Sequence, residues 1–178
     1  MARHRTGHLY VKSPSHTFRI RALLELFPSA SYIWVARNPV DLFDSNKQMW
    51  SSMFERYGLW EWDRKVLDDF LDVAMIRSAN CLDLACTLLA PERFAVIDFS
   101  SFTSQPIRTL QLINARFRLA SWDIARPCVE RVVDRNAGNA TIGHASRACQ
   151  ELPGSTRRAM RLLSEAHARA LASHGIVQ

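Results

Sequence analysis

The chain has 178 residues, of which 48% are apolar and 22% charged, and its formal net charge is +6. These values are ordinary for a globular protein and allow one domain with a sizeable core, so we predict a single domain over residues 1–178. No apolar run reaches the roughly 20 residues of a membrane span, and the apolar stretch near the N-terminus is too short for a signal peptide, so we expect a cytoplasmic protein.

The first 50 residues alternate between strand and helix patterns. Residues 9–11 predict a short buried strand that ends before Pro14, because proline cannot continue a central ladder. The apolar spacing from Ile20 to Phe27 predicts a helix. Residues 31–36 predict a strand buried on both faces, and the pair Asn38-Pro39 is typical of the start of a helix, here over residues 39–50.

The rest of the chain continues this alternation. We predict a long helix over residues 61–89, a strand over 94–99 and a helix that begins at Pro106. Further along, Pro127 predicts the start of a short helix, residues 137–143 a loop, and residues 155–173 a final helix capped near Gly175. Strands that alternate with helices indicate an α/β fold with a parallel sheet.

Cysteine and histidine residues indicate no metal site. The cysteines form no CxxC pair and have no histidine at ligand spacing, so we predict buried free thiols at Cys81, Cys86, Cys128 and Cys149. Five histidines have no supporting context and are predicted to lie on the surface: His4, His8, His144, His167 and His174. The positive charge fits an anionic small molecule, and in the absence of a recognisable motif a basic nucleic-acid-binding module is the least favoured alternative.

Arg37 is the strongest candidate for an anion-binding residue. It directly follows a predicted strand, at the sheet edge where ligands of open α/β sheets bind. The helix that begins at Pro39 directs free backbone N–H groups and the positive end of its dipole to the same place. Ser45 lies two helical turns beyond Asn38 on the same face, and its hydroxyl adds a further donor. These residues predict a phosphate site, with a structural salt bridge at Arg37 as the alternative.

Several segments of the first half resemble the sulfotransferases that use 3′-phosphoadenosine 5′-phosphosulfate (PAPS), and especially the bacterial branch of that family. The resemblance is carried by residues 9–16, 19–20, 23–30 and 37–45. In that family an arginine and the serine eight residues later hold the 3′-phosphate, which implies this role for Arg37 and Ser45. The dense match marks residues 9–50 as the core nucleotide-binding segment of a P-loop-type parallel sheet with flanking helices, the sulfotransferase fold.

Lys12 and His16 precede the first predicted helix at the same edge of the sheet. Sulfuryl transfer requires a base for the acceptor hydroxyl and a cation for the leaving phosphate oxygen, and imidazole and ammonium groups suit these two tasks. The resemblance implies that both residues face the sulfuryl group. Arg135, followed by Gly138, is a weaker candidate for a late loop that closes over the nucleotide. No metal is expected.

Two elements of the family pattern are not found in this sequence. None of the six glycines forms the Gly-Arg-Ser-Gly-Thr-like loop that cradles the 5′-phosphosulfate, and Ser100 and Ser101 replace two acidic residues. We therefore expect a sulfotransferase fold that is incomplete at the N-terminus and is completed by a partner chain. The enzymatic activity of this chain alone is expected to be weak or absent. The expected acceptor is a small molecule, a glycan or a lipid. The alternative is a non-catalytic remnant or partner subunit that binds adenosine 3′,5′-bisphosphate.

Overall fold

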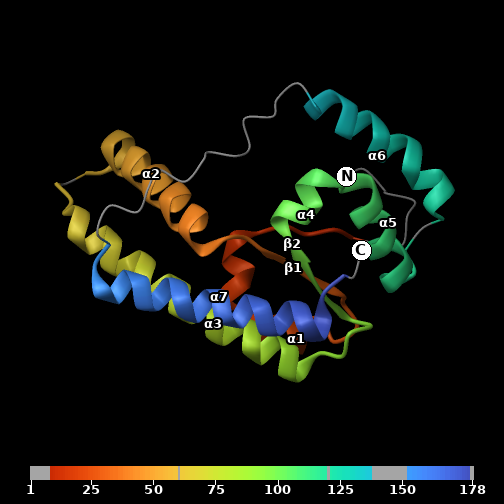
Figure 1. Cartoon of the computed structure of the whole chain (residues 1–178), viewed down its shortest axis with the longest axis horizontal. Helices are drawn as coiled ribbons and strands as arrows, with labels where there is room; N and C mark the ends of the chain where they lie inside the picture. The colour runs from red at the N-terminus through yellow and green to blue at the C-terminus, as the bar shows by residue number, and fades with distance from the viewer. Residues whose placement is uncertain (1–8, 60, 120, 138–151, 177–178) are drawn as a thin grey trace.

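The structure is a computed structural model that describes residues 9–59, 61–119, 121–137 and 152–176 (Figure 1). Its elements in chain order are η1 (Pro14–Phe18), α1 (Ile20–Leu26), β1 (Tyr32–Ala36), α2 (Pro39–Tyr57), α3 (Arg64–Leu88), β2 (Phe94–Asp98), α4 (Phe99–Ser104), α5 (Pro106–Phe117), α6 (Trp122–Ala137) and α7 (Gly154–His174). None of the helices in these ranges is long and apolar enough to cross a membrane.

The two strands form a small parallel sheet. Tyr32 pairs with Phe94 at one end and Ala36 with Asp98 at the other, and α2 and α3 make the crossover between the strands. On its other edge β2 meets the end of the chain, where the backbone N–H of Ile176 donates to the carbonyl of Val96 at 3.0 Å. β2 is therefore the central strand, which is why its first four residues are all buried.

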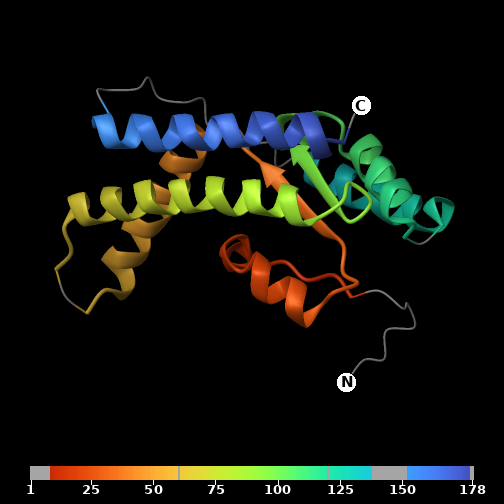
Figure 2. The same ribbon diagram turned by 90° about the horizontal axis from the view of Figure 1, so that it is seen from below.

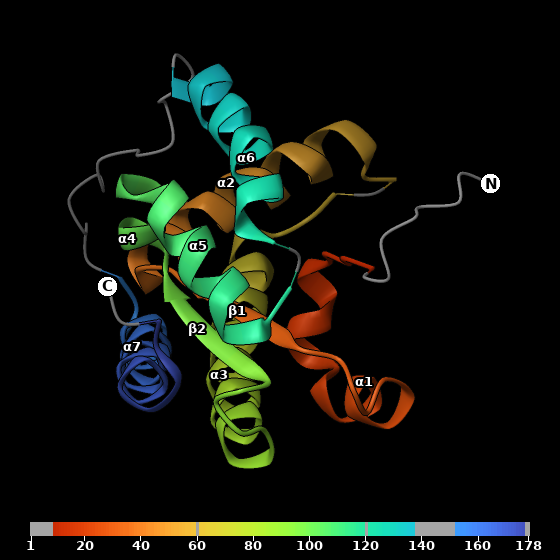
Figure 3. The same ribbon diagram turned by 90° about the vertical axis from the view of Figure 1, so that its right-hand side faces the viewer.

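Helices α3 and α7 form the body of the molecule. They run side by side in the same direction (Figure 2) and contribute most of the core residues. In Figure 3 both helices lie below the strands, whereas α4 and α5 lie above them and α6 extends beyond α5. The fully buried side chains include Leu82 of α3, Leu163 of α7 and Val96 of β2, which join the two long helices to the sheet.

Polar contacts reinforce the pairing of α3 with α7. The buried hydroxyl of Thr156 donates to a carboxylate oxygen of the buried Asp72 at 3.1 Å. Near the other end, Arg169 and Asp83 form an ion pair at 2.7 Å. The buried pair of Thr156 and Asp72 requires its partners in a defined position, so it fixes the register of the two helices, whereas the ion pair of Arg169 and Asp83 is exposed and contributes little.

Most of the predicted elements are confirmed, and with them the α/β class. The strands at residues 31–36 and 94–99 correspond to β1 and β2, and the helices predicted at 61–89, from Pro106 and at 155–173 correspond to α3, α5 and α7. The side chain of Asn38 caps α2 by accepting from the N–H of Val40 at 2.9 Å. The backbone N–H of Gly175 donates to Leu171 at the end of α7, where a Cβ would overlap that carbonyl.

The strand predicted at residues 9–11 is wrong. Leu9, Tyr10 and Val11 have no regular structure and are 87%, 71% and 67% exposed. A strand forms only when a neighbour completes its ladder of hydrogen bonds, and β1 pairs with β2 on one edge only among the described residues. The apolar run was identified correctly, but the strand partner that it requires is missing from the described structure.

The prediction that β1 is buried on both faces is also wrong. Ile33 and Val35 are 47% and 48% exposed, whereas Tyr32, Trp34 and Ala36 face the core. The reason is position: β1 is the edge strand, and the helices that bury β2 on both sides do not extend over the outer face of β1.

Three helix predictions need correction. α2 continues beyond Trp50 to Tyr57 and ends at Gly58. α4 was not predicted; it forms because the carboxylate of Asp98 accepts from the N–H of Ser101 at 2.8 Å and caps the helix. Pro127 does not open a helix but lies inside α6, at an exposed position where the loss of one backbone hydrogen bond is tolerated.

The histidine and cysteine predictions are partly wrong. His167 and His174 are buried in α7, where Nε2 of His174 donates to the carbonyl of Leu89 at 3.0 Å. Cys81 and Cys86 are free and half-buried, and burial raises the pKa of both thiols. Cys128 is free but exposed. The predictions for His4, His8, His144, Cys149 and the loop at residues 138–143 lie outside the described residues.

Substitution of Leu82 tests the contact between the long helices and the sheet. Because Leu82 is fully buried, Leu82→Ala should lower the free energy of unfolding by about 2–5 kcal/mol. Leu88→Ala, in the same helix at a position that is 47% exposed, should cost about 0.5 kcal/mol. Urea denaturation followed by circular dichroism measures both values, and equal losses would contradict the packing.

Candidate functional site

The carboxyl ends of the two strands place Arg37 beside Phe99. Ala36 and Asp98 are partners in the ladder, so the next residue of each strand leaves the sheet at the same height. The guanidinium of Arg37 lies over the ring of Phe99, 5.1 Å from its centroid. This cation–π contact holds the arginine in place without neutralising its charge. The strand register brings together two residues that are 62 positions apart in the sequence (99 − 37).

Arg37 retains unused hydrogen-bonding capacity. Its Nε atom is buried and has no hydrogen-bond partner among the described residues. An unpaired buried donor costs about 1–3 kcal/mol, and native structures rarely leave one without a functional or ligand-related reason. The adjacent N-terminus of α2 adds the positive end of its dipole and the backbone N–H of Asp41, whereas Pro39 has no N–H and the N–H of Val40 donates to Asn38. Arg37 and the first turn of α2 are thus suited to binding an anion.

His16 shows the same feature. It lies in η1, which packs on α3, and its Nδ1 atom is buried without a hydrogen-bond partner in the described ranges. Lys12 lies on the chain leading into η1 and is exposed. Among the described residues no hydrogen bond joins Lys12 or His16 to Arg37 or Ser45. The structure therefore gives His16 an open ring nitrogen but joins none of these four residues to another by a hydrogen bond.

Ser45 and Arg135 are both exposed. Ser45 lies on the second turn of α2, seven residues after the capping Asn38. Arg135 was predicted in a loop, which is wrong: it lies in the last turn of α6, because the helix that begins at Trp122 extends to Ala137. α6 packs on α5 and not on α2. A role for Arg135 in nucleotide binding remains a prediction.

Phe99 is the residue of this site that sequence reasoning missed. A usable signal was present, because Arg37 and Phe99 each follow a predicted strand directly. Residues that follow two neighbouring parallel strands lie side by side. The contact of Arg37 with Phe99 can therefore be predicted only once the two strands are known to pair. Sequence alone did not reveal which strands pair.

Two titratable side chains near the end of β2, Asp98 and His167, have shifted pKa values. Burial disfavours the charged form of Asp98, but hydrogen bonds from Ser100 and Ser101 outweigh this effect, so the pKa of the carboxyl is lowered. Burial lowers the pKa of the His167 imidazole, and the negative charge of Asp98 opposes that shift in part. A charged carboxylate and a neutral buried imidazole therefore coexist near the end of β2.

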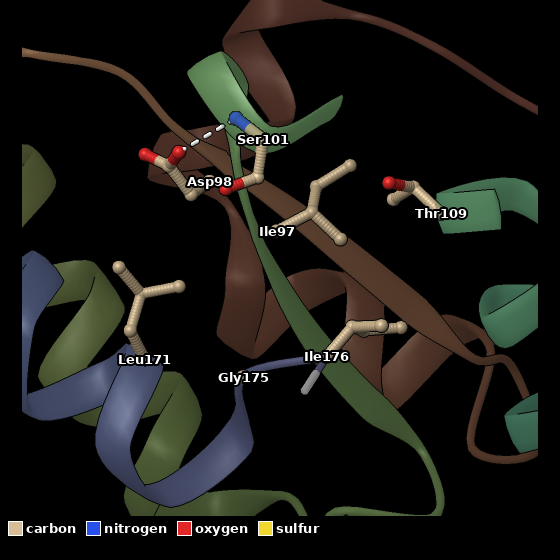
Figure 4. Close-up of a pocket in the computed structure, with 7 residues that line it drawn as sticks. All are labelled: Ile97, Asp98, Ser101, Thr109, Leu171, Gly175 and Ile176. Carbon is tan, nitrogen blue, oxygen red and sulfur yellow. Dashed lines mark hydrogen bonds between the residues drawn. The ribbon is translucent and has the colours of Figure 1, made fainter. Parts of the chain in front are cut away.

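A cavity of about 290 Å³ adjoins Asp98 (Figure 4). Ile97, Leu171 and Ile176 supply its apolar wall. The polar groups that line it are already engaged: Asp98 caps α4, and the hydroxyl of Thr109 donates to the carbonyl of Gln105 at 3.0 Å. The cavity lies where β2 meets the end of α7. Within the described ranges no three His, Cys, Asp or Glu side chains gather as metal ligands would.

The parallel sheet with flanking helices places Arg37 beyond the carboxyl ends of the strands, where ligands bind in open α/β folds. The model of the sulfotransferase family matches residues 1–123 of the chain. Because this match covers more than half of the chain, the protein belongs to the sulfotransferase family. The match includes β1, α2, α3 and β2, and therefore both Arg37 and Phe99.

Two curated relatives share part of this sequence. The omega-hydroxy-beta-dihydromenaquinone-9 sulfotransferases of Mycobacterium tuberculosis and Mycobacterium bovis are each 25% identical to the chain over 131 residues. The alignment covers 74% of this chain and 34% of each relative, so the chain spans about a third of their length. No solved structure matches the chain.

The buried imidazole of His167 makes stability depend on pH. An unfolded imidazole titrates near pH ~6.5, and the folded pKa is lower, so the unfolded chain binds this proton first as the pH falls. The free energy of unfolding should therefore decrease below about pH 7, by at most about 1.4 kcal/mol per pH unit from this group. His167→Gln should reduce that slope in urea denaturation between about pH 5 and 8. An unchanged slope would contradict the assignment.

Proposed function

We propose that this protein binds the nucleotide portion of PAPS and serves in the transfer of its sulfuryl group to an acceptor hydroxyl. Arg37 and Ser45 bind the 3′-phosphate, and Lys12 and His16 serve the reacting end. The observation that carries this proposal is the open hydrogen-bonding capacity of Arg37 and His16: each has a buried nitrogen without a partner in the described structure. A phosphate oxygen that accepts a hydrogen bond from Nε of Arg37 would satisfy one of these two nitrogens.

The proposed chemistry needs only groups that this chain contains and the two substrates. The acceptor oxygen attacks the sulfur atom while the bond between sulfur and the bridging phosphate oxygen breaks. His16 takes the proton of the acceptor hydroxyl, and the ammonium of Lys12 stabilises the charge that develops on the leaving oxygen. The products are a sulfate ester and adenosine 3′,5′-bisphosphate. Arg37, held against Phe99, keeps the nucleotide in line for this displacement.

For the acceptor we propose an alcohol, and the relatives favour a lipid among the possible classes. By its name, the mycobacterial relative acts on an omega-hydroxylated menaquinone derivative. We further propose that contacts to the 5′-phosphosulfate come from a partner chain, because the six glycines of this sequence do not form a phosphate-cradling cluster. Two exposed apolar features support a missing neighbour, namely residues 9–11 and the outer face of β1.

A second candidate is a non-catalytic subunit that binds adenosine 3′,5′-bisphosphate. Lys12 is exposed and forms no hydrogen bond with Arg37 or His16 in the described structure, which favours nucleotide binding over complete catalytic machinery in this chain alone. The two candidates share the Arg37 site and differ only in whether transfer occurs.

Binding of adenosine 3′,5′-bisphosphate tests the shared site. Charge-assisted hydrogen bonds contribute about 1.5–3 kcal/mol, so Arg37→Ala should weaken binding about 10- to 100-fold in isothermal titration calorimetry. Ser45→Ala removes one hydroxyl donor and should weaken it roughly 3- to 10-fold. Arg108→Ala, an exposed arginine on α5, is the matched control and should leave the affinity unchanged. Equal affinities of wild type and Arg37→Ala would show that the site is misassigned.

Transfer of radiolabelled sulfate from PAPS to a polyprenol, above the signal without protein, would identify the catalytic candidate. We expect the isolated chain to transfer little or no sulfate, because it lacks a phosphate-cradling glycine cluster. If transfer is observed, it should be lost in His16→Asn, which keeps a polar side chain of similar size but cannot act as a base near neutral pH. Transfer that persists in His16→Asn would remove this residue from the mechanism.

A further inference from the structure

A groove of about 400 Å³ lies between α5 and α6, on the side of the sheet opposite to α3 and α7 (Figure 3). A volume of this size accommodates a small organic molecule. None of the residues of the proposed nucleotide site lines it, so the groove is a separate feature of the molecule. Its lining brings together cationic, amide, hydroxyl and aromatic side chains: Ser104, Gln105, Arg108, Gln111, Trp122 and Arg126.

The groove presents a cation that the described residues leave uncompensated. Its lining includes no carboxylate. Arg126 is engaged, because its Nε atom contacts Oε1 of Glu130 at 2.7 Å, and Glu130 and, more weakly, Asp123 raise the pKa of its guanidinium. Arg108, on the facing helix, is exposed and forms no ion pair with a described residue. The available charge is thus that of Arg108, which favours a ligand with one negative charge.

Trp122 adds a flat apolar surface to the groove. It is the first residue of α6 and lies one turn before Arg126, on the same side of that helix. Its side chain is half-buried, and in the described ranges no other aromatic ring and no cation stacks on the indole. A planar ring that stacks on tryptophan gains more than its buried area alone provides. The ligand that fits this groove is therefore planar as well as anionic.

Neutral polar side chains complete the lining. Gln111 lies three residues after Arg108 on the same side of α5. Gln105 is the N-cap residue of α5, and its side chain makes no capping hydrogen bond. A primary amide donates as well as accepts, so these two side chains can bind an oxygen of an oxyanion or the polar edge of a ring. Small-molecule sites orient their ligands by this combination of a flat apolar surface and a few polar groups.

We propose that this groove binds a planar aromatic monoanion, with its ring on Trp122 and its oxyanion group on Arg108. A carboxylate suits the guanidinium, because two parallel N–H donors can bind both of its oxygens. A nucleotide with two phosphate groups is disfavoured, because each phosphate carries a charge of about −1.5 to −2 near neutral pH and Arg108 supplies only one positive charge. The groove thus holds a ligand of its own, whatever binds at Arg37.

Three probes separate the contribution of the ring from that of the charge. 2-Naphthoate carries both, 2-naphthamide has nearly the same shape without the charge, and acetate has the charge without the ring. In isothermal titration calorimetry at neutral pH and low salt, 2-naphthoate should bind about tenfold more tightly than 2-naphthamide and about a hundredfold more tightly than acetate. Equal affinities for 2-naphthoate and 2-naphthamide, or no binding of 2-naphthoate, would overturn the proposal.

Substitution of Arg108 tests the anion contact. Arg108→Gln keeps a polar side chain and removes the charge, so it should weaken 2-naphthoate binding about tenfold and leave 2-naphthamide binding nearly unchanged. Trp122→Leu should weaken the binding of both probes about fivefold. Arg131→Gln is the matched control, because Arg131 is an exposed arginine of α6 that does not line the groove, and both affinities should stay unchanged. An equal loss in Arg108→Gln and Arg131→Gln would reduce the effect to the net charge of the protein and overturn the proposal.

Two further measurements test whether the groove is a separate site. Adenosine 3′,5′-bisphosphate should not displace 2-naphthoate, and Arg37→Ala should leave the affinity for 2-naphthoate unchanged. Competition between the two ligands would place 2-naphthoate in the proposed nucleotide site and overturn the proposal. In sedimentation velocity, wild type and Arg108→Gln should behave alike. A dimer that dissociates in Arg108→Gln would make the groove a contact between copies of the chain, which also overturns it.

Discussion

The parallel pairing of β1 with β2 is the contact on which the candidate site depends. The pairing of Ala36 with Asp98 brings Arg37 against Phe99, and a shift of one residue would move every side chain of one strand to the opposite face. The contact of Arg37 with Phe99 is thus a consequence of strand register. The cap of α4 by Asp98 is, by contrast, a local contact, because α4 follows β2 directly.

The two strands of the sheet are buried to different extents. β2 is central, with β1 on one edge and Gly175 on the other, and α3 and α7 cover it from below. β1 lies at the edge with Ile33 and Val35 exposed. A parallel sheet usually has both faces covered, so this uneven burial agrees with the proposed partner chain. Other large apolar side chains are also exposed in this part of the molecule, at residues 9–11 and along α2.

The open nitrogens of Arg37 and His16 connect this architecture to binding. Both residues were selected from the sequence, Arg37 on its position after a strand and His16 mainly on family resemblance. The structure independently gives each a buried nitrogen without a described partner. The unpaired nitrogens leave each residue free to bind a ligand, and their roles stay proposals. Lys12 and Ser45 are exposed, and their roles depend on the ligands and neighbours that would surround them.

The sequence by itself determined most of the helices, the strands that correspond to β1 and β2, and the N-cap at Asn38, because periodicity and capping are local properties. It also indicated the family and Arg37. Only the tertiary structure decided that residues 9–11 form no strand, that β1 is an edge strand, that His167 and His174 are buried and that Phe99 adjoins Arg37. These outcomes depend on which elements become neighbours. A local pattern shows that a segment can be buried or paired, but long-range packing decides whether it is.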